Sequence, residues 1–216
     1  MRKYFFAAFF LSNSFAYAQQ VNQPVKLVQY VFDDFKPGTV KLKSGQIYKQ
    51  VLNYNIITRE MVFDNNGKFT AIANVENIDA VDIGNRKFIP LNNKFYEVLV
   101  PGKMPLILDF TATVREPGTS IGYGSTTNTS AASSYQSLIR GGGAYQLKLP
   151  DGFTVIPKHD FFILKDAKLE KVANVKQLIK IFPDKKDLIK DFVEKNDTRF
   201  SNRNDMTDLI KQLEGD

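Results

Sequence analysis

The feature that most constrains the fold is a series of short apolar segments separated by turn-forming residues, which fills residues 25–116. Inside several segments apolar and polar residues alternate, and residues 106–114 place Leu106, Leu108 and Phe110 on one face. Segments of about four to nine residues with turns every 8 to 12 residues are typical of antiparallel sheets. We therefore expect a mainly β domain over residues 25–164, with a meandering or barrel-like antiparallel sheet.

The strongest single turn signal is the tetrapeptide Asp64-Asn65-Asn66-Gly67. Asparagine and glycine both tolerate positive φ, which the tight turns of two-residue hairpin loops require. This tetrapeptide predicts a hairpin between strands at residues 61–63 and 69–75. It is too short for a calcium-binding loop, because the ligand spacing fails.

The end of the chain changes from strand to helix periodicity, and residues 173–214 are expected to form about three short helices packed on the β domain. Asn174, Asp184 and Asn204 are the expected N-caps, and Pro183 should end the first helix. Short amphipathic helices need a surface to dock on. The overall class is therefore α+β, mainly β. The apolar stripes expected to face inward are Val175, Leu178, Ile179 and Phe182, then Leu188, Ile189, Phe192 and Val193, and finally Met206, Leu209, Ile210 and Leu213.

Residues 116–144 interrupt the strand pattern with glycine, serine, threonine and asparagine. So few large apolar residues cannot repay the entropy of ordering the segment. We expect a flexible loop here, and a loop of this length is either disordered or functional.

The N-terminus resembles a secretory signal peptide over residues 1–18. Arg2 and Lys3 precede an apolar run of about 11 residues, which is short against the roughly 20 that a membrane-spanning helix needs. Ala16-Tyr17-Ala18 matches the small residues that signal peptidase reads. Cleavage should leave Gln19 first. The protein is therefore expected to be exported and to be periplasmic, outer-membrane associated or extracellular.

Composition narrows the possible functions. The chain has no cysteine, which excludes thiol catalysis, lipid attachment at a cysteine and cysteine-ligated metal sites. The net charge of +6 is spread along the chain, which argues for solubility rather than nucleic-acid binding. With 18 phenylalanines, the chain can build a core without disulfides.

Several segments of the chain resemble exported β-rich proteins of unknown function from Bacteroidota. They include Leu52-Asn53-Tyr54-Asn55, Val81-Asp82-Ile83-Gly84, Phe95-Tyr96-Glu97-Val98-Leu99 and the helical tail around Ile189-Lys190-Asp191-Phe192. The resemblance covers most of the chain after the signal segment, except residues 116–144. It implies a bacterial envelope setting and a β body with a helical end, and it brings no catalytic residues.

The sequence contains no pattern that identifies a catalytic, cofactor-binding or metal-binding residue. His159 is the single histidine, and no G-x-S-x-G motif accompanies it, so it is interpreted as a lone surface or strand-edge residue, although Pro157-Lys158 before it predicts a turn. Carboxylates could in principle act in pairs as in glycosidases. Glu97 and Asp109 are expected on the outer face of their strands. The acidic candidates are Asp33, Asp34, Glu60, Glu76, Asp79, Asp82, Glu97 and Asp109.

Three functions agree with these features of the sequence. The leading hypothesis is an exported, non-enzymatic envelope protein that binds another protein or an envelope component. The alternative is a glycan- or small-ligand-binding module in a β groove, and the third is a carboxylate-dependent hydrolase. The groove would need a concave set of exposed tyrosines, drawn from Tyr48, Tyr54, Tyr96, Tyr123, Tyr135 and Tyr145.

Overall fold

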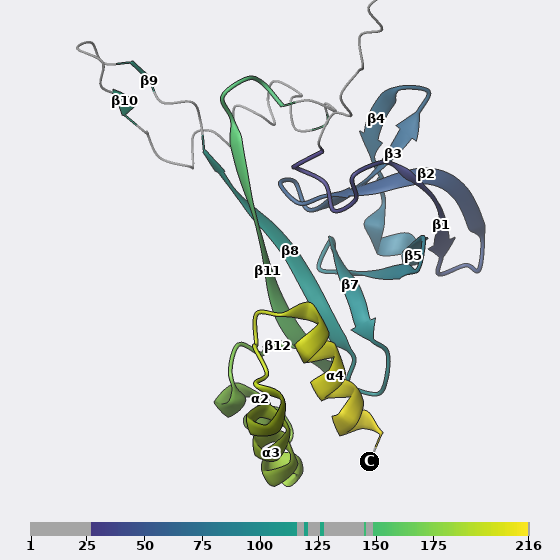
Figure 1. Ribbon diagram of the computed structural model, residues 1–216. Helices are drawn as coiled ribbons and strands as arrows, with labels where there is room; N and C mark the ends of the chain where they lie inside the picture. The colour runs from purple at the N-terminus through teal and green to yellow at the C-terminus, as the bar shows by residue number, and fades with distance from the viewer. Residues whose placement is uncertain (1–26, 116–118, 121–125, 128–144, 146–148, 216) are drawn as a thin grey trace, which may run out of the picture.

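The computed structural model describes residues 27–115, 119–120, 126–127, 145 and 149–215 (Figure 1). The expected signal peptide, and all of the predicted loop at residues 116–144 except four residues, lie outside these ranges. Ten strands form one antiparallel sheet, and three α-helices follow it at the C-terminal end. The predicted fold class is confirmed.

The sheet is built from two antiparallel meanders, which are joined by one strand pairing near its centre. After β4 a 3-10 turn, η1 (Val75–Asn77), returns the chain so that β5 pairs with the free edge of β1. The spatial order is β12-β11-β8-β7-β6-β5-β1-β2-β3-β4. The strands are β1 (Lys36–Leu42), β2 (Ile47–Asn55), β3 (Glu60–Asn65), β4 (Lys68–Ala71), β5 (Ile78–Ile83), β6 (Arg86–Leu91), β7 (Lys94–Val100), β8 (Leu106–Arg115), β11 (Thr154–Lys165) and β12 (Lys168–Lys171). A separate pair joins β9 (Thr119–Ser120) to β10 (Thr126–Thr127).

The hairpin predicted at Asn66-Gly67 is confirmed. Asn65 pairs with Lys68, and the two turn residues have φ of 53° and 84°. The Asp64 carboxylate accepts the Gly67 N–H at 2.6 Å, which fixes the turn further.

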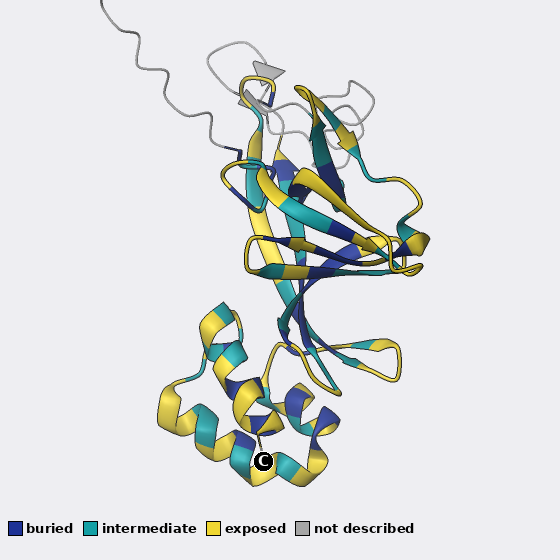
Figure 2. Cartoon of the chain, turned by 90° about the vertical axis from the view of Figure 1, so that its right-hand side faces the viewer, coloured by how far each residue is buried: buried dark blue, intermediate teal, exposed yellow. Residues whose placement is uncertain are grey.

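The sheet curls so that β2 meets β7, although three strands lie between them in the sheet order. The Tyr54 hydroxyl on β2 donates to the carbonyl of Phe95 on β7 at 3.0 Å. Figure 2 shows the buried residues gathered on the inside of this curl. The curl encloses an apolar core, here called the sheet core, built from residues that include Leu52, Tyr54, Met61, Val81, Phe88 and Phe95.

The helices cover the other end of the long strands β8 and β11 (Figure 1). They are α2 (Val175–Ile181), α3 (Lys186–Asn196) and α4 (Arg203–Glu214), with a 3-10 turn, η3 (Pro183–Lys185), between the first two. All four residues of the predicted α4 stripe are buried, whereas on α3 only Ile189 is buried and its neighbours are half-buried. These residues form a second core, here called the helical core, with Leu106, Leu108, Phe161 and Ile163 of the sheet.

Two of the three predicted helix caps are wrong. Asn174 caps α2 as expected, because its side chain accepts the Gln177 N–H at 3.0 Å. Asp184 instead lies inside η3, and α3 begins after Lys185 with no side-chain cap. Asn202, not Asn204, caps α4 and accepts the N–H groups of both Asn204 and Asp205. Caps two residues apart with the same side chain cannot be separated by sequence pattern alone.

The turn predicted after Pro157-Lys158 is wrong, because His159 lies inside β11 opposite Phe110, but as an exposed strand residue it agrees with the surface or strand-edge interpretation. The two apolar runs that flank Pro157 form one strand of 12 residues. Pro157 is tolerated because β12 pairs only with the last part of β11, so that at Pro157 one edge of the strand faces no other strand among the described residues.

Candidate functional site

The candidate site is built on the first half of β2, residues 47–51. These residues pair with β1 on one edge, from Lys41 opposite Ile47 to Pro37 opposite Val51. The β2–β3 pairing begins only at Leu52, which lies opposite Phe63. The other edge of residues 47–51 therefore faces no strand in the described part of the chain. Beyond Phe63, β3 separates from β2 and continues into the hairpin with β4 (Figure 1).

Three large apolar side chains are exposed on this half strand. Ile47, Tyr48 and Val51 are exposed by 59%, 44% and 39% of their full surface, and they are the exposed large apolar residues of the described chain. Ile47 and Val51 lie on one face of β2, and Tyr48 lies on the other. Single exposed apolar residues are ordinary on protein surfaces, but a cluster at an open strand edge marks an interaction surface.

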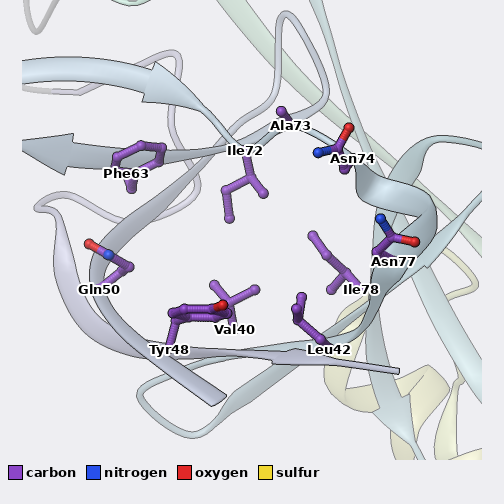
Figure 3. Close-up of a pocket in the computed structure, with 10 residues that line it drawn as sticks. All are labelled: Val40, Leu42, Tyr48, Gln50, Phe63, Ile72, Ala73, Asn74, Asn77 and Ile78. Atoms are coloured by element: carbon purple, nitrogen blue, oxygen red, sulfur yellow. The ribbon is translucent and has the colours of Figure 1, made fainter. Parts of the chain in front are cut away.

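An apolar hollow, here called the inner hollow, opens beside this edge and has a volume of about 260 Å³. Figure 3 shows Tyr48 and Gln50 of β2 on one side of it and Phe63 and Ile72 on the other. Asn74, which precedes η1, and Asn77, its last residue, supply amide groups at the rim of the hollow. Val40, Leu42 and Ile78 complete the apolar lining.

A second hollow, here called the outer hollow, lies along the same stretch of β2 and has a volume of about 530 Å³. Lys49 and Val51 line it from β2, and Asp64 lines it from β3. Gln50 borders both hollows. The two hollows therefore lie on either side of the wedge-shaped gap between residues 47–51 and the β3–β4 hairpin. This gap is here called the β2 wedge. One hollow is apolar and the other carries charges.

Glu97 was expected on an outer face, but its side chain is 1% exposed and held by two arginines. Arg86 donates from Nε and Nη2 to its two carboxylate oxygens, each at 2.6 Å, and Arg203 of α4 donates from Nη1 at 2.6 Å. Burial alone would raise the pKa of Glu97, but these hydrogen bonds outweigh burial and hold the pKa below its ordinary value.

The Glu97 cluster lies between the two cores. Glu97 is paired across the sheet with Phe88 of the sheet core and with Leu108 of the helical core. The Arg86 guanidinium also lies over the rings of Phe32 and Phe88, 4.7 and 5.6 Å from their centroids. Because both of its carboxylate oxygens accept hydrogen bonds from arginines, Glu97 forms a structural ion pair and is not a free acid or base.

Asp109 was also expected on an outer face, and it too is buried, in an ion pair with Arg59. Arg59 reaches it from the β2–β3 turn, where its backbone takes the left-handed conformation with φ of 62°. Burial raises the pKa of Asp109, and the Arg59 charge offsets this only in part. Across the β8–β11 pairing Asp109 faces Asp160, whose carboxylate is bound to Lys171 at 2.8 Å. Both carboxylates have cationic partners, which leaves no free pair for glycoside hydrolysis here.

The remaining acidic candidates are dispersed. Glu60 accepts a hydrogen bond from the Tyr145 hydroxyl at 2.5 Å, and Asp79 is paired with Lys41 at 3.1 Å. Asp82 lines the outer hollow. Asp33, Asp34 and Glu76 are exposed on the surface.

The tyrosines expected to line a glycan groove do not gather on one described surface. Tyr54 and Tyr96 are buried, Tyr145 is half-buried, and Tyr48 alone of these four is exposed, at the inner hollow. Tyr123 and Tyr135 lie outside the described residues. His159 is exposed and contacts the carbonyl oxygen of Ser201 through Nε2 at 2.9 Å, which links β11 to the segment before α4.

The described residues contain no group of three or more histidine, cysteine, aspartate or glutamate side chains able to hold a metal ion. Among the described helices, none has the length and apolar character needed to cross a bilayer. Comparison with known proteins found no matching family model, no similar curated protein and no similar solved structure. The site must therefore be interpreted from its own geometry.

The series of short apolar segments over residues 25–116 predicts strands in this region, but it does not show that half of β2 lies at an open edge. The one available signal is that its partner is short, because β2 has nine residues and β3 has six. Which part of the longer strand remains unpaired depends on register, which follows from the β2–β3 turn and the packing of the whole sheet.

Proposed function

We propose that this is an exported, non-enzymatic protein that binds another protein of the cell envelope through the β2 wedge. One observation carries the proposal: Ile47, Tyr48 and Val51 expose large apolar surface at an open strand edge beside an apolar hollow. Natural proteins normally protect such edges with charges, bulges or prolines, because an unprotected edge recruits other chains. Lys49 is the single charge on residues 47–51, between the exposed apolar side chains. A partner that covers the edge prevents it from pairing with other chains.

The dimensions and chemistry of the inner hollow favour a protein partner over a small ligand. Pockets for drug-sized ligands usually have volumes of roughly 300–1,000 Å³ and bury most of the ligand. The inner hollow, at about 260 Å³, is open at the edge of β2 and has the size for one or two apolar side chains. Its lining includes no carboxylate, lysine, arginine or histidine that would orient a sugar or drive catalysis.

Export is supported by the order of basic, apolar and Ala-x-Ala segments in residues 1–18. N-terminal sequencing of the protein purified from cells that naturally make it should find Gln19 first. A chain that retains Met1 would contradict export by this route.

Site-specific photocrosslinking in those cells tests the binding function. A photoreactive phenylalanine analogue is placed at Tyr48 in the wedge, and, as a control, at Lys190 on the exposed face of α3. We expect one reproducible crosslinked protein from position 48, absent from position 190 and lost when Phe63→Ser is added to remove the far wall of the hollow. Equal products from both positions, or none from position 48, would contradict the proposal.

A further inference from the structure

The hydrogen-bonding pattern of the β1–β2 hairpin identifies which backbone groups face the open edge. The Leu42 N–H donates to the Gln46 carbonyl at 2.8 Å, and the Gly45 N–H donates to the Leu42 carbonyl at 2.9 Å. Hydrogen-bonded pairs recur at every second position of an antiparallel ladder. The pairs Val40/Tyr48 and Gly38/Gln50 therefore bond to each other.

The intervening residues Ile47, Lys49 and Val51 consequently direct their N–H and C=O groups away from β1. Pro37, which has no N–H, lies opposite Val51 and agrees with this alternation, because that pair needs no β1 donor. The described chain places no strand beside these three residues, so the edge presents three donors and three acceptors at regular spacing. Only an extended polypeptide matches such a row.

We infer that the partner contributes an extended segment that adds to β2 as a further strand in the β2 wedge. This inference rests on the proposed function and specifies its binding mode. The backbone of the segment pairs with Ile47, Lys49 and Val51. Strand addition of this kind derives affinity from main-chain hydrogen bonds and specificity from alternate side chains.

The two hollows define the sequence of that segment. Side chains directly opposite Tyr48 and Gln50 share their face and enter the inner hollow, whose lining is apolar. The side chain opposite Lys49 lies on the outer face, on the side of the outer hollow that Asp64 lines. The segment is therefore apolar at alternate positions, with a polar residue between them.

Phage-displayed random dodecapeptides provide the probe, because they sample this pattern without a known partner. They are selected on the intact protein and counter-selected on Lys49→Pro, which removes one edge N–H without altering the inner hollow. Lys49→Thr is the matched control that keeps the N–H. We expect enriched peptides to alternate apolar and polar residues, and to lose at least about tenfold in affinity with Lys49→Pro but not with Lys49→Thr. No enrichment, or equal binding to both variants, would overturn strand addition.

Amide hydrogen exchange by NMR gives a second readout that does not depend on how a proline is tolerated. In the free protein the amides of Ile47, Lys49 and Val51 should exchange quickly, whereas those of Tyr48 and Gln50 should be protected by β1. An enriched peptide should slow the three edge amides at least about tenfold. Binding without that protection overturns strand addition but leaves the proposed function standing if position 48 still crosslinks a partner.

A second copy of this chain is the competing occupant, since two β2 edges could pair with each other. In that case the three edge amides would be protected before any peptide is added and would lose protection on dilution, and sedimentation would show a dimer. That result would overturn the inference that a partner protein contributes the added strand. Failure of both crosslinking at position 48 and peptide binding would instead remove the proposed function.

Discussion

Arg203, the first residue of α4, hydrogen-bonds through both terminal guanidinium nitrogens to the carboxylate of Glu97 on β7, 106 residues earlier in the chain. Arg86 of β6 donates hydrogen bonds to the same carboxylate. One buried acid thus joins the sheet to the helical end. The two cationic partners together compensate the cost of burying this charge.

Replacing Glu97 with glutamine should lower the free energy of unfolding by about 3 kcal/mol, because two arginines lose their shared counter-charge inside the protein. Urea unfolding at pH 7 measures the change. Glu194→Gln on the exposed face of α3 is the matched control and should stay within about 0.5 kcal/mol. Equal effects of the two substitutions would contradict the role assigned to Glu97.

The stability difference between the wild type and Glu97→Gln should depend on pH. The folded pKa of Glu97 is lower than its ordinary value of 4.5, so the unfolded chain takes up the proton first as the pH falls. The stabilisation is complete above that ordinary value and decreases as the pH falls through the folded pKa. Unfolding measured from pH 7 down to pH 3 should show the two proteins converging, and a constant difference would contradict the ion pair.

Asp109→Asn should show the opposite trend with pH. Burial raises the folded pKa of Asp109, so its charged form is disfavoured in the folded state despite Arg59. The contribution of this carboxyl to stability is present at low pH and is lost as the pH rises through the folded pKa. At pH 7 the substitution should therefore cost less than Glu97→Gln. A larger cost, measured in the same urea series, would contradict this ranking.

Gly38→Ala should destabilise the sheet by about 2 kcal/mol. A Cβ at Gly38 would lie 2.5 Å from the backbone oxygen of Asp82 and 3.0 Å from Cδ1 of Leu52, so neighbouring strands must move apart. Gly102→Ala is the control, because the three atoms nearest to its added Cβ all belong to the flexible end of Glu214. Thermal unfolding should show a drop of several degrees for the first variant and little change for the second.

Tyr48→Ser combined with Val51→Thr should separate binding from folding. Both side chains are exposed, so the free energy of unfolding should change by less than about 1 kcal/mol. Capture of the partner from a photoreactive group at Ile47 should nevertheless be lost, because the apolar contact surface is removed. A double variant that folds normally and still captures the partner at the wild-type level would place the interface elsewhere.

Sequence patterns predicted an element correctly where they depend only on residues close together in the chain. The Asn66-Gly67 hairpin and the α4 stripe from Met206 to Leu213 are confirmed, because turn chemistry and helical spacing are local properties. Glu97 and Asp109 were misplaced because alternation assumes that one face of a strand is open to water. Their arginine partners come from a turn and a helix that only the curled sheet and the docked tail bring near.

The long pairing of β8 with β11 has a consequence for how the protein folds. About 40 residues of chain separate Arg115 from Thr154, where this ladder begins, and forming it requires closing that loop at an entropic cost. Phe110 of this ladder packs against the sheet core, whereas Leu106 and Phe161 belong to the helical core. All buried members of the sheet core precede this loop, whereas the helical core also takes Phe161 and the helices from beyond it. The helical core should therefore form only in the slow kinetic phase that closes the loop, and the sheet core can form before it.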